Sequence, residues 1–333
     1  MAYTKYLKEW SFHLYSVWLF TFSDLKTIVL SSTTFGLFGG IAISFDDASA
    51  PDSSLHILLS SQILSKIPLV VFWVWINLLP FAINNQRQPE AIQEDSLNKP
   101  WRTMPSKRLS PASAKRLMFT FYLVAVVVSF FFDNLKQCLT LVLLGHWYNN
   151  LRGADANCLV RNFINACGFS CFSSGAMQVA IGGHGTGRIR SESALQPFGW
   201  WYVVIACVIF STVQTQDMYD QRGDAARNRK TVPLVIGDGP ARWTIAVPMA
   251  VWCWATPWLW ASSNVGYVGP VTLGLTVAFR TLRERSEDGD KNTFRLWNLW
   301  LVSVYILPLI KALETYLGGK AIEDTMRYRL PKL

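Results

Sequence analysis

The chain reads Asp217-Met218-Tyr219-Asp220-Gln221-Arg222-Gly223-Asp224 directly after a long apolar run, Trp200–Thr215. This stretch places carboxylates at positions i, i+3 and i+7, namely Asp217, Asp220 and Asp224. Side chains at this spacing point to the same face of a helix. Clustered anions repel one another unless a cation joins them, and Mg²⁺ takes carboxylate oxygens together with substrate phosphates. The spacing therefore favours a magnesium site at the end of an apolar segment.

Basic residues follow this acidic stretch at once, at Arg227, Arg229 and Lys230. A solvated acidic helix end is the alternative interpretation of such a DxxDxxxD pattern. Here, however, the carboxylates end a segment of membrane length and adjoin cations. That combination favours a site for a magnesium diphosphate over an ordinary polar surface.

The composition is that of a membrane protein. Of the 333 residues, 51% are hydrophobic and only 16% charged, and fifteen are Trp. The net charge of +9 would also suit nucleic-acid binding. The basic residues are confined to loops between apolar segments, however, so the positive-inside rule accounts for them and no nucleic-acid partner is expected. No CxxC or HExxH pattern occurs, so a thiolate or histidine metal centre is not expected either.

The apolar segments predict about nine transmembrane helices in a single domain that covers residues 1–333. The segments are Leu25–Ile43, Leu55–Ile83, Leu117–Phe132, Leu135–Tyr148, Leu159–Ile181, Trp200–Gln216, Trp243–Ala261, Val265–Leu282 and Leu296–Leu313. Residues 1–22 mix aromatic residues with charged ones, which predicts an interfacial amphipathic helix. An extension of the first span is the alternative for these residues.

Loop charge predicts the orientation of the chain. With nine spans, the N-terminus and the loops at 84–116, 217–242 and 283–295 share one side, and these loops carry most of the Lys and Arg residues. The opposite side has mainly Lys136, Arg188 and Arg190, together with a basic tail that fits the rule poorly. The bias places the motif loops in the cytosol, in a multi-pass protein of the endoplasmic reticulum membrane.

The loop at 84–116 repeats the order of acid followed by base. Glu90 and Glu94 are one helical turn apart with Asp95 beside them, and Lys99 and Arg102 follow. Arg can bind two phosphate oxygens at once, and Lys acts as a point charge. Two such loops on one membrane face suggest one diphosphate that Mg²⁺ bridges between them. Ordinary cytosolic loop charge is the alternative.

At these two loops the sequence resembles the UbiA superfamily of intramembrane prenyltransferases. The stretch Asp95-x-x-Asn98-Lys99-Pro100-Trp101-Arg102 resembles its first motif. The stretch Asp217-x-x-Asp220-x-x-Gly223-Asp224, followed by Thr231-Val232-Pro233, resembles its second. The resemblance implies an all-α integral membrane protein with about nine transmembrane helices around a central apolar cavity.

The first motif departs from the family pattern NDxxDxxxD. Counting back from Asp95 without gaps, Ala91 and Gln88 stand where the earlier aspartates would be. An insertion would instead make Asn85 the motif's Asn and leave Glu90 and Glu94 as replacement ligands. The sequence leaves both alignments open.

The resemblance and the loop chemistry together assign the site. The metal ligands are Glu90, Glu94, Asp95, Asp217, Asp220 and Asp224, of which the four aspartates are the catalytic set. The diphosphate-binding residues are Asn98, Lys99, Arg102, Arg161, Arg229 and Lys230. Arg161 is included because a charge within an apolar segment marks a functional site, with snorkelling to the interface as its alternative.

The sequence is similar to fungal members of the superfamily, among them UbiA-type sesquiterpene cyclases of the fumagillin-pathway type. This similarity lies in the variant first motif and in the stretch before the first span, Asp24-Leu25-Lys26-Thr27. We therefore expect Mg²⁺-dependent ionisation of farnesyl diphosphate followed by cyclisation. Transfer of the isoprenyl group to an aromatic or other small acceptor is the alternative, and a membrane transporter is a remote third. No obligate protein partner is indicated, only the lipid bilayer, and product skeleton and oligomeric state stay open.

Overall fold

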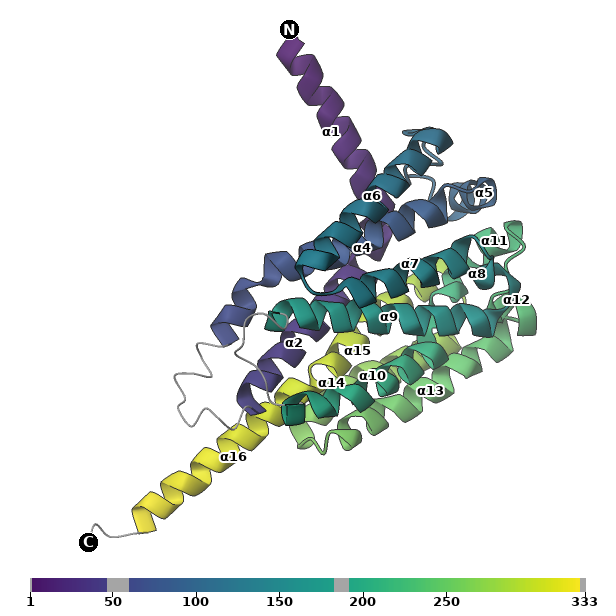
Figure 1. Ribbon diagram of the computed structural model, residues 1–333. Coiled ribbons are helices and arrows are strands. Elements are labelled where there is room, and N and C mark those ends of the chain that lie inside the picture. Colours follow the sequence, from purple (N-terminus) through teal and green to yellow (C-terminus); the bar gives the residue numbers. More distant parts are fainter. Residues whose placement is uncertain (1, 47–59, 183–191, 330–333) are drawn as a thin grey trace.

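The computed structural model describes residues 2–46, 60–182 and 192–329, and this part of the chain contains helices and no strands. Figure 1 shows a bundle of long helices. The elements are α1 (Ala2–Thr21), η1 (Phe22–Asp24), η2 (Leu25–Leu30), α2 (Ser31–Asp46), α4 (Ile67–Gln86), α5 (Pro89–Asn98), α6 (Pro111–Phe131), α7 (Leu135–Asn149), α8 (Gly153–Ala156), α9 (Cys158–Ile181), α10 (Glu192–Thr212), η4 (Val213–Thr215), α11 (Asp217–Ala226), α12 (Val232–Ile236), α13 (Asp238–Leu259), α14 (Asn264–Arg283), α15 (Glu287–Tyr305) and α16 (Leu307–Arg329).

Within the described residues, six helical runs are long and apolar enough to cross a membrane. They are Lys8–Phe45, Ile67–Gln86, Pro111–Phe131, Gln196–Thr215, Asn264–Arg283 and Glu287–Gly318. The other predicted segments also form helices, but α7, for example, has only 15 residues. At about 1.5 Å per residue it is shorter than the hydrocarbon core. The all-helical membrane architecture is supported, while the count of nine spans stays a prediction.

The N-terminal residues form α1, which continues through the 3₁₀ turn η1 and the π-helix η2 into α2. The helix at the N-terminus is thus continuous with the first span, as in the alternative in which residues 1–22 extend that span. The outer half of α1 projects from the bundle (Figure 1) and exposes Tyr6, Trp10 and Leu14. Its predicted place in the membrane interface stays a prediction. Arg188, Arg190 and the start of the second predicted span lie outside the described residues.

The core is built from buried aromatic rings and close helix contacts. Trp73, Trp201, Trp297 and Trp300 are fully buried. Gly36 of α2 lies so close to α9 that a Cβ would come within 2.6 Å of the carbonyl carbon of Ala176. A small residue is required there because the two backbones touch, as is common between membrane helices.

The short helices gather at one end of the bundle. Figure 1 shows α5, α8, α11 and α12 at that end, and α16 leaves the bundle at the opposite end. The helices α5 and α11, which carry the two motifs, pack against each other although 118 residues separate their ends at Asn98 and Asp217. The fold therefore brings the two motif loops to one place, as the sequence predicts.

Candidate active site

Asn98 joins the two motif helices. It is the last residue of α5, and its amide Nδ2 donates a hydrogen bond to the backbone carbonyl of Asp220 at 3.1 Å. Its Oδ1 accepts a hydrogen bond from the backbone N–H of Gly223, also at 3.1 Å. One side chain thus satisfies a donor and an acceptor of α11 and fixes the distance between the motifs.

Gly223 makes this approach possible. A Cβ at this position would lie 2.2 Å from Nδ2 of Asn98, far inside van der Waals contact. A larger residue must therefore displace the side chain of Asn98 and break its hydrogen bonds to α11.

We expect Gly223→Ala to lower turnover about 100-fold, because a displacement of about 1 Å at a catalytic site has an effect of this size. Gly239→Ala is the matched control, since a Cβ at Gly239 meets no atom within 4 Å. Steady-state kinetics of both purified variants check this. Equal turnover in the two variants would show that the spacing of the motifs is not critical.

A buried network of ion pairs forms the centre of the site. Glu94 accepts hydrogen bonds from Nη1 of Arg227 at 2.9 Å and from Nη1 of Arg229 at 3.1 Å. Arg229 also donates to Asp224 at 2.9 Å and to Asp155 of α8 at 3.1 Å. Arg227 lies 3.2 Å from Asp155. All five side chains are buried. The network connects α5, α8, α11 and the residues that follow α11.

Each carboxylate of the second motif faces a cation. Arg161 of α9 donates to Oδ1 of Asp217 at 2.8 Å and also to the hydroxyl of Tyr148. Lys99 lies 3.0 Å from both carboxylate oxygens of Asp220.

The first motif has a similar pair. Nη1 of Arg102 donates to the two carboxylate oxygens of Asp95 at 2.8 and 3.1 Å. Buried pairs of this kind are weak evidence for stability, because desolvation offsets much of the attraction. Their concentration at one end of the bundle is better explained by binding of a charged ligand.

The carboxyl groups in this network differ in their proton affinity. Burial opposes ionisation of Glu94, but Arg229 and Arg227 more than offset it and hold the pKa of this carboxyl below its usual value. Burial raises the pKa of Asp224 to about 7, with contributions from Asp217 and Glu94, although Arg229 and Arg161 oppose the rise. Burial also raises the pKa of Asp95 against the effect of Arg102. The neighbouring cations thus offset the burial of the Asp224 carboxylate only in part.

The donor set fits a divalent cation that prefers oxygen. In the described ranges no group of three or more acidic, His or Cys side chains is already arranged around a metal position. However, Oδ2 of Asp217 and Oδ2 of Asp224 are buried and accept no hydrogen bond. A buried carboxylate oxygen without a bonding partner destabilises the folded state. Mg²⁺ with its bound waters is a suitable partner.

The structure separates the predicted site residues into two sets. Ten of them lie at this end of the bundle in the contacts described above: Glu94, Asp95, Asn98, Lys99, Arg102, Arg161, Asp217, Asp220, Asp224 and Arg229. Glu90 is exposed and the side chain of Lys230 is exposed as well. Lys230 reaches the network only through its backbone N–H, which donates to the carbonyl of Asp155 at 2.9 Å.

The first motif places Ala91 on the buried side of α5 with Glu94 and Asp95. Burial of Ala91 suits the alignment without gaps, and burial of Glu94 suits the alignment with an insertion, so both alignments stay open. Oδ1 of Asn85 is nevertheless buried without a hydrogen-bond partner. The assignment of Asn85 as the motif's Asn therefore stays a prediction.

The site residues assigned from the sequence did not include Asp155, Arg227, Asp24 and Tyr148. Arg227 was visible as part of the basic run after the second motif, and Asp24 as part of the stretch before the first span. Asp24 lies close enough to Arg102 and Lys99 to interact with both electrostatically. Asp155 carried no signal, because one carboxylate in a short polar segment has no pattern to identify it.

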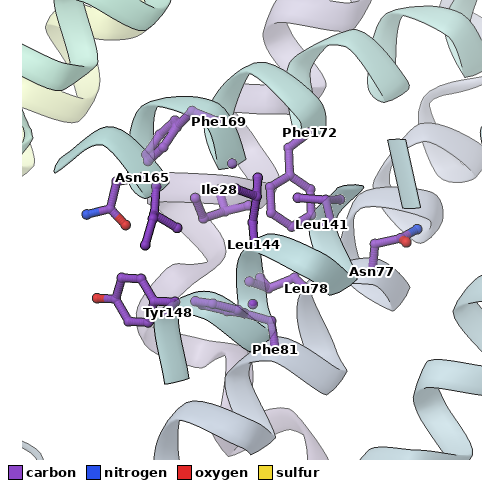
Figure 2. A pocket seen from close by; sticks show the side chains of 13 residues that line it. Ile28, Asn77, Leu78, Phe81, Leu141, Leu144, Tyr148, Asn165, Phe169 and Phe172 are labelled. Carbon is purple, nitrogen blue, oxygen red and sulfur yellow. The ribbon is translucent and has the colours of Figure 1, made fainter. Parts of the chain in front are cut away.

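A small apolar chamber lies inside the bundle beside this network. It has a volume of about 70 Å³ and is lined by side chains of η2, α4, α7 and α9. Figure 2 shows Tyr148 and Asn165 at one end of the chamber and Asn77 at the other. Tyr148 contacts Arg161, which contacts Asp217. The chamber therefore begins next to the carboxylates of the second motif.

Comparison with known proteins identifies the family. Residues 57–300 match the UbiA prenyltransferase family. The chain is 27% identical to fumagillin beta-trans-bergamotene synthase of Aspergillus fumigatus over 90% of this chain and 94% of that protein. It is 25% identical to a polyprenyl transferase of Hericium erinaceus over 71% of this chain and 78% of that protein.

The fold agrees with this match. A UbiA homologue from Archaeoglobus fulgidus, solved with DMAPP and Mg²⁺, superposes with a TM-score of 0.51 and 11% identity over 85% of this chain and 98% of that chain. The similar proteins are enzymes, so the chain is an enzyme rather than a transporter. With a family match over residues 57–300 and a similar fold, the chain belongs to the UbiA prenyltransferase family.

Proposed function

We propose that this protein ionises an isoprenyl diphosphate, most readily farnesyl diphosphate, with Mg²⁺ and then cyclises the isoprenyl cation. The observation that carries the proposal is a buried network of acids and bases with two unpartnered carboxylate oxygens, directly beside an apolar chamber. Similarity to a bergamotene synthase over most of the chain supports cyclisation. The motif end would face the cytosol and the bundle would lie in the membrane of the endoplasmic reticulum.

The cations of the network would exchange partners when substrate binds. In this structure four cations each form an ion pair with a carboxylate: Lys99, Arg102, Arg161 and Arg229. With Mg²⁺ on Asp217, Asp220 and Asp224, and with Glu94 and Asp95 as partners on the other motif, these cations become free to bind phosphate oxygens. Bound Mg²⁺ would offset the negative charge that builds on the leaving diphosphate.

The reaction would begin with cleavage of the bond between C1 and the diphosphate oxygen, whose electron pair leaves with the diphosphate. Arg161 and Arg229 can stabilise that charge because both are buried beside the carboxylates. The allylic cation would remain in the chamber, where the rings of Phe81, Phe169 and Phe172 can stabilise it. Loss of a proton or capture of water then ends the reaction.

The depth of the chamber favours a folded chain. Along α7 its lining runs from Leu141 to Tyr148, which is about 10 Å at 1.5 Å per residue. An extended farnesyl chain of twelve main-chain carbons is longer, about 14 Å with carbon–carbon bonds of about 1.5 Å. Because the free volume is only about 70 Å³, rings such as Phe169 must move to admit the chain. A chain that enters a chamber of this depth must bend, which brings its double bonds towards C1.

We expect Gly168→Leu to lower turnover of farnesyl diphosphate at least about tenfold and to shift preference towards geranyl diphosphate. Gly168 lines the chamber, and a Cβ there would meet no atom within 4 Å. The Cβ of the leucine therefore causes no clash, and the rest of its side chain occupies space that the substrate needs. Gly199→Leu is the control, because Gly199 also has no neighbour within 4 Å and does not line the chamber. Unchanged chain-length preference in Gly168→Leu would show that the tail lies elsewhere.

Transfer to a small acceptor is the second candidate. It is supported by the similarity to the polyprenyl transferase of Hericium erinaceus. Both functions share the ionising half of the site and differ in what the isoprenyl cation meets next.

A further inference from the structure

One polar side chain of the apolar chamber has no part in the steps described above. Asn165 lies within α9 and lines the chamber. It follows Arg161 by four residues, so it faces the same side of the helix one turn, about 6 Å, further into the bundle. Figure 2 shows it at the same end of the chamber as Tyr148. Asn165 therefore stands between the carboxylate network and the apolar wall of the chamber.

The amide of Asn165 differs from the other polar groups of the chamber in its hydrogen bonds. Nδ2 of Asn77 donates to the backbone carbonyl of Trp73 at 2.9 Å. The hydroxyl oxygen of Tyr148 accepts a hydrogen bond from Arg161. Within the described part of the chain, the half-buried side chain of Asn165 forms no hydrogen bond. An amide in apolar surroundings is unfavourable without a partner, so its place here points to a ligand.

The chemistry of the amide selects that ligand. Asn165 offers N–H donors and an acceptor oxygen, and the hydrocarbon tail of an isoprenyl diphosphate satisfies neither. A water molecule satisfies both. The hydroxyl hydrogen of Tyr148 is a second partner for this water, because no acceptor for it lies among the described residues. The chamber volume of about 70 Å³ exceeds what one water needs, which is about 10–15 Å³ with two or more polar partners.

The cation would return to this end of the chamber. An isoprenyl chain that bends in the chamber brings its double bonds towards C1. Ring closure joins C1 to another carbon of the chain, so the new cationic carbon lies near C1 and near the mouth of the chamber. Asn165 is one helical turn from Arg161, which stabilises the leaving diphosphate in the proposed function. A water on the Asn165 amide is therefore placed beside the cation.

We propose that Asn165, together with the hydroxyl of Tyr148, holds a water molecule that ends the reaction. The inference rests on the ionisation step of the proposed function. The water oxygen donates an electron pair to the cationic carbon and forms a C–O bond, and one water proton passes to the released diphosphate. Isoprenyl diphosphate and water thus give an alcohol and protonated inorganic diphosphate. Asn165 favours capture of water over loss of a proton, so it determines the product.

The test measures the origin of the oxygen in the product. Full-length protein in phosphatidylcholine nanodiscs is incubated with farnesyl diphosphate and Mg²⁺ in water enriched in oxygen-18, and products are separated by gas chromatography with mass spectrometry. Oxygen-18 enters the organic product only where water attacks carbon, so hydrolysis at phosphorus is not counted. We expect alcohols that contain oxygen-18 as the main wild-type products. In Asn165→Leu their share relative to hydrocarbons should fall at least about tenfold, because leucine keeps the size of the side chain but removes its hydrogen bonds to the water.

Three further variants separate a water site from a structural role. Asn165→Ser keeps a polar group and leaves room for water, so it should retain most of the alcohol. Tyr148→Phe removes the second partner of the water and should lower the alcohol share. Ser170→Leu is the matched control on the same helix, since the Ser170 hydroxyl donates to the carbonyl of Ala166 at 3.0 Å and Ser170 does not line the chamber. Its alcohol share should equal that of the wild type.

Hydrocarbons as the only wild-type products would overturn the assignment. So would an alcohol share in Asn165→Leu or Tyr148→Phe that equals the wild-type share. If the labelled alcohol is open-chain farnesol, cyclisation is refuted, while loss of that label in Asn165→Leu still supports the water site. Asp217→Asn supplies the background rate of hydrolysis, and wild-type products that do not exceed this background would refute both ionisation and the water site.

Discussion

Asp217→Asn and Asp224→Asn should each lower release of inorganic diphosphate about 100- to 1,000-fold, the range found when a group that stabilises transition-state charge is removed. Each of these aspartates has one buried oxygen without a hydrogen-bond partner, which a bound Mg²⁺ would occupy. Asparagine keeps the shape of the side chain but removes the charge that holds the metal. The measurement is the rate of diphosphate release from farnesyl diphosphate as a function of Mg²⁺ concentration.

Asp288→Asn serves as the control for both variants. Asp288 is an exposed carboxylate at the start of α15 and lies outside the network. Its loss should leave the rate unchanged. Wild-type rates in Asp217→Asn or Asp224→Asn, or a rate that survives EDTA, would show that the carboxylates do not hold a metal.

Glu94→Gln should lower turnover about 100-fold and the free energy of unfolding by about 3 kcal/mol, because removal of one partner of a buried ion pair leaves a buried charge uncompensated. Here two guanidinium groups, those of Arg227 and Arg229, lose that partner. Glu90→Gln should leave both quantities unchanged, since Glu90 is exposed on the same helix. Chemical denaturation and steady-state rates of the two variants provide the comparison. Equal losses in both variants would restore Glu90 as a ligand.

These two glutamates also mark how far the sequence could predict the site. Their spacing of four residues predicts a shared face of a helix. Glu94 is buried, whereas Glu90 is exposed although it lies on the same helix α5. Only tertiary packing decides which part of a helix is covered, and a spacing rule contains no information about it.

The side-chain directions in the basic run after the second motif could not be predicted from the sequence either. The sequence predicted Arg229 and Lys230 as diphosphate-binding residues, while the structure brings Arg227 and Arg229 into the network and leaves the side chain of Lys230 exposed. The helix α11 ends at Ala226, and Asn228 has a positive φ of 57°. This left-handed residue reverses the chain, so positions next to each other point to different sides. A loop of this kind has no period from which side-chain direction can be read.

The second motif was predictable because its helix is regular. Asp217, Asp220 and Asp224 share one buried face of α11, as their spacing indicates. The apolar segments likewise located the helices, since backbone groups in a bilayer must be satisfied within one element. The role of Asp155 could not be predicted from the sequence, because α8 is one short turn whose position depends on its packing against α7 and α9.

The most direct test of the central claim is one incubation of the membrane-embedded enzyme with Mg²⁺ and farnesyl diphosphate, with no acceptor present. Products are extracted and separated by gas chromatography with mass spectrometry. The proposed function predicts that a cyclic C15 hydrocarbon or alcohol accumulates over many turnovers, and that Asp217→Asn forms none. Slow release of farnesol alone, with a prenylated adduct only after an aromatic acceptor is added, would contradict cyclisation and establish transfer instead.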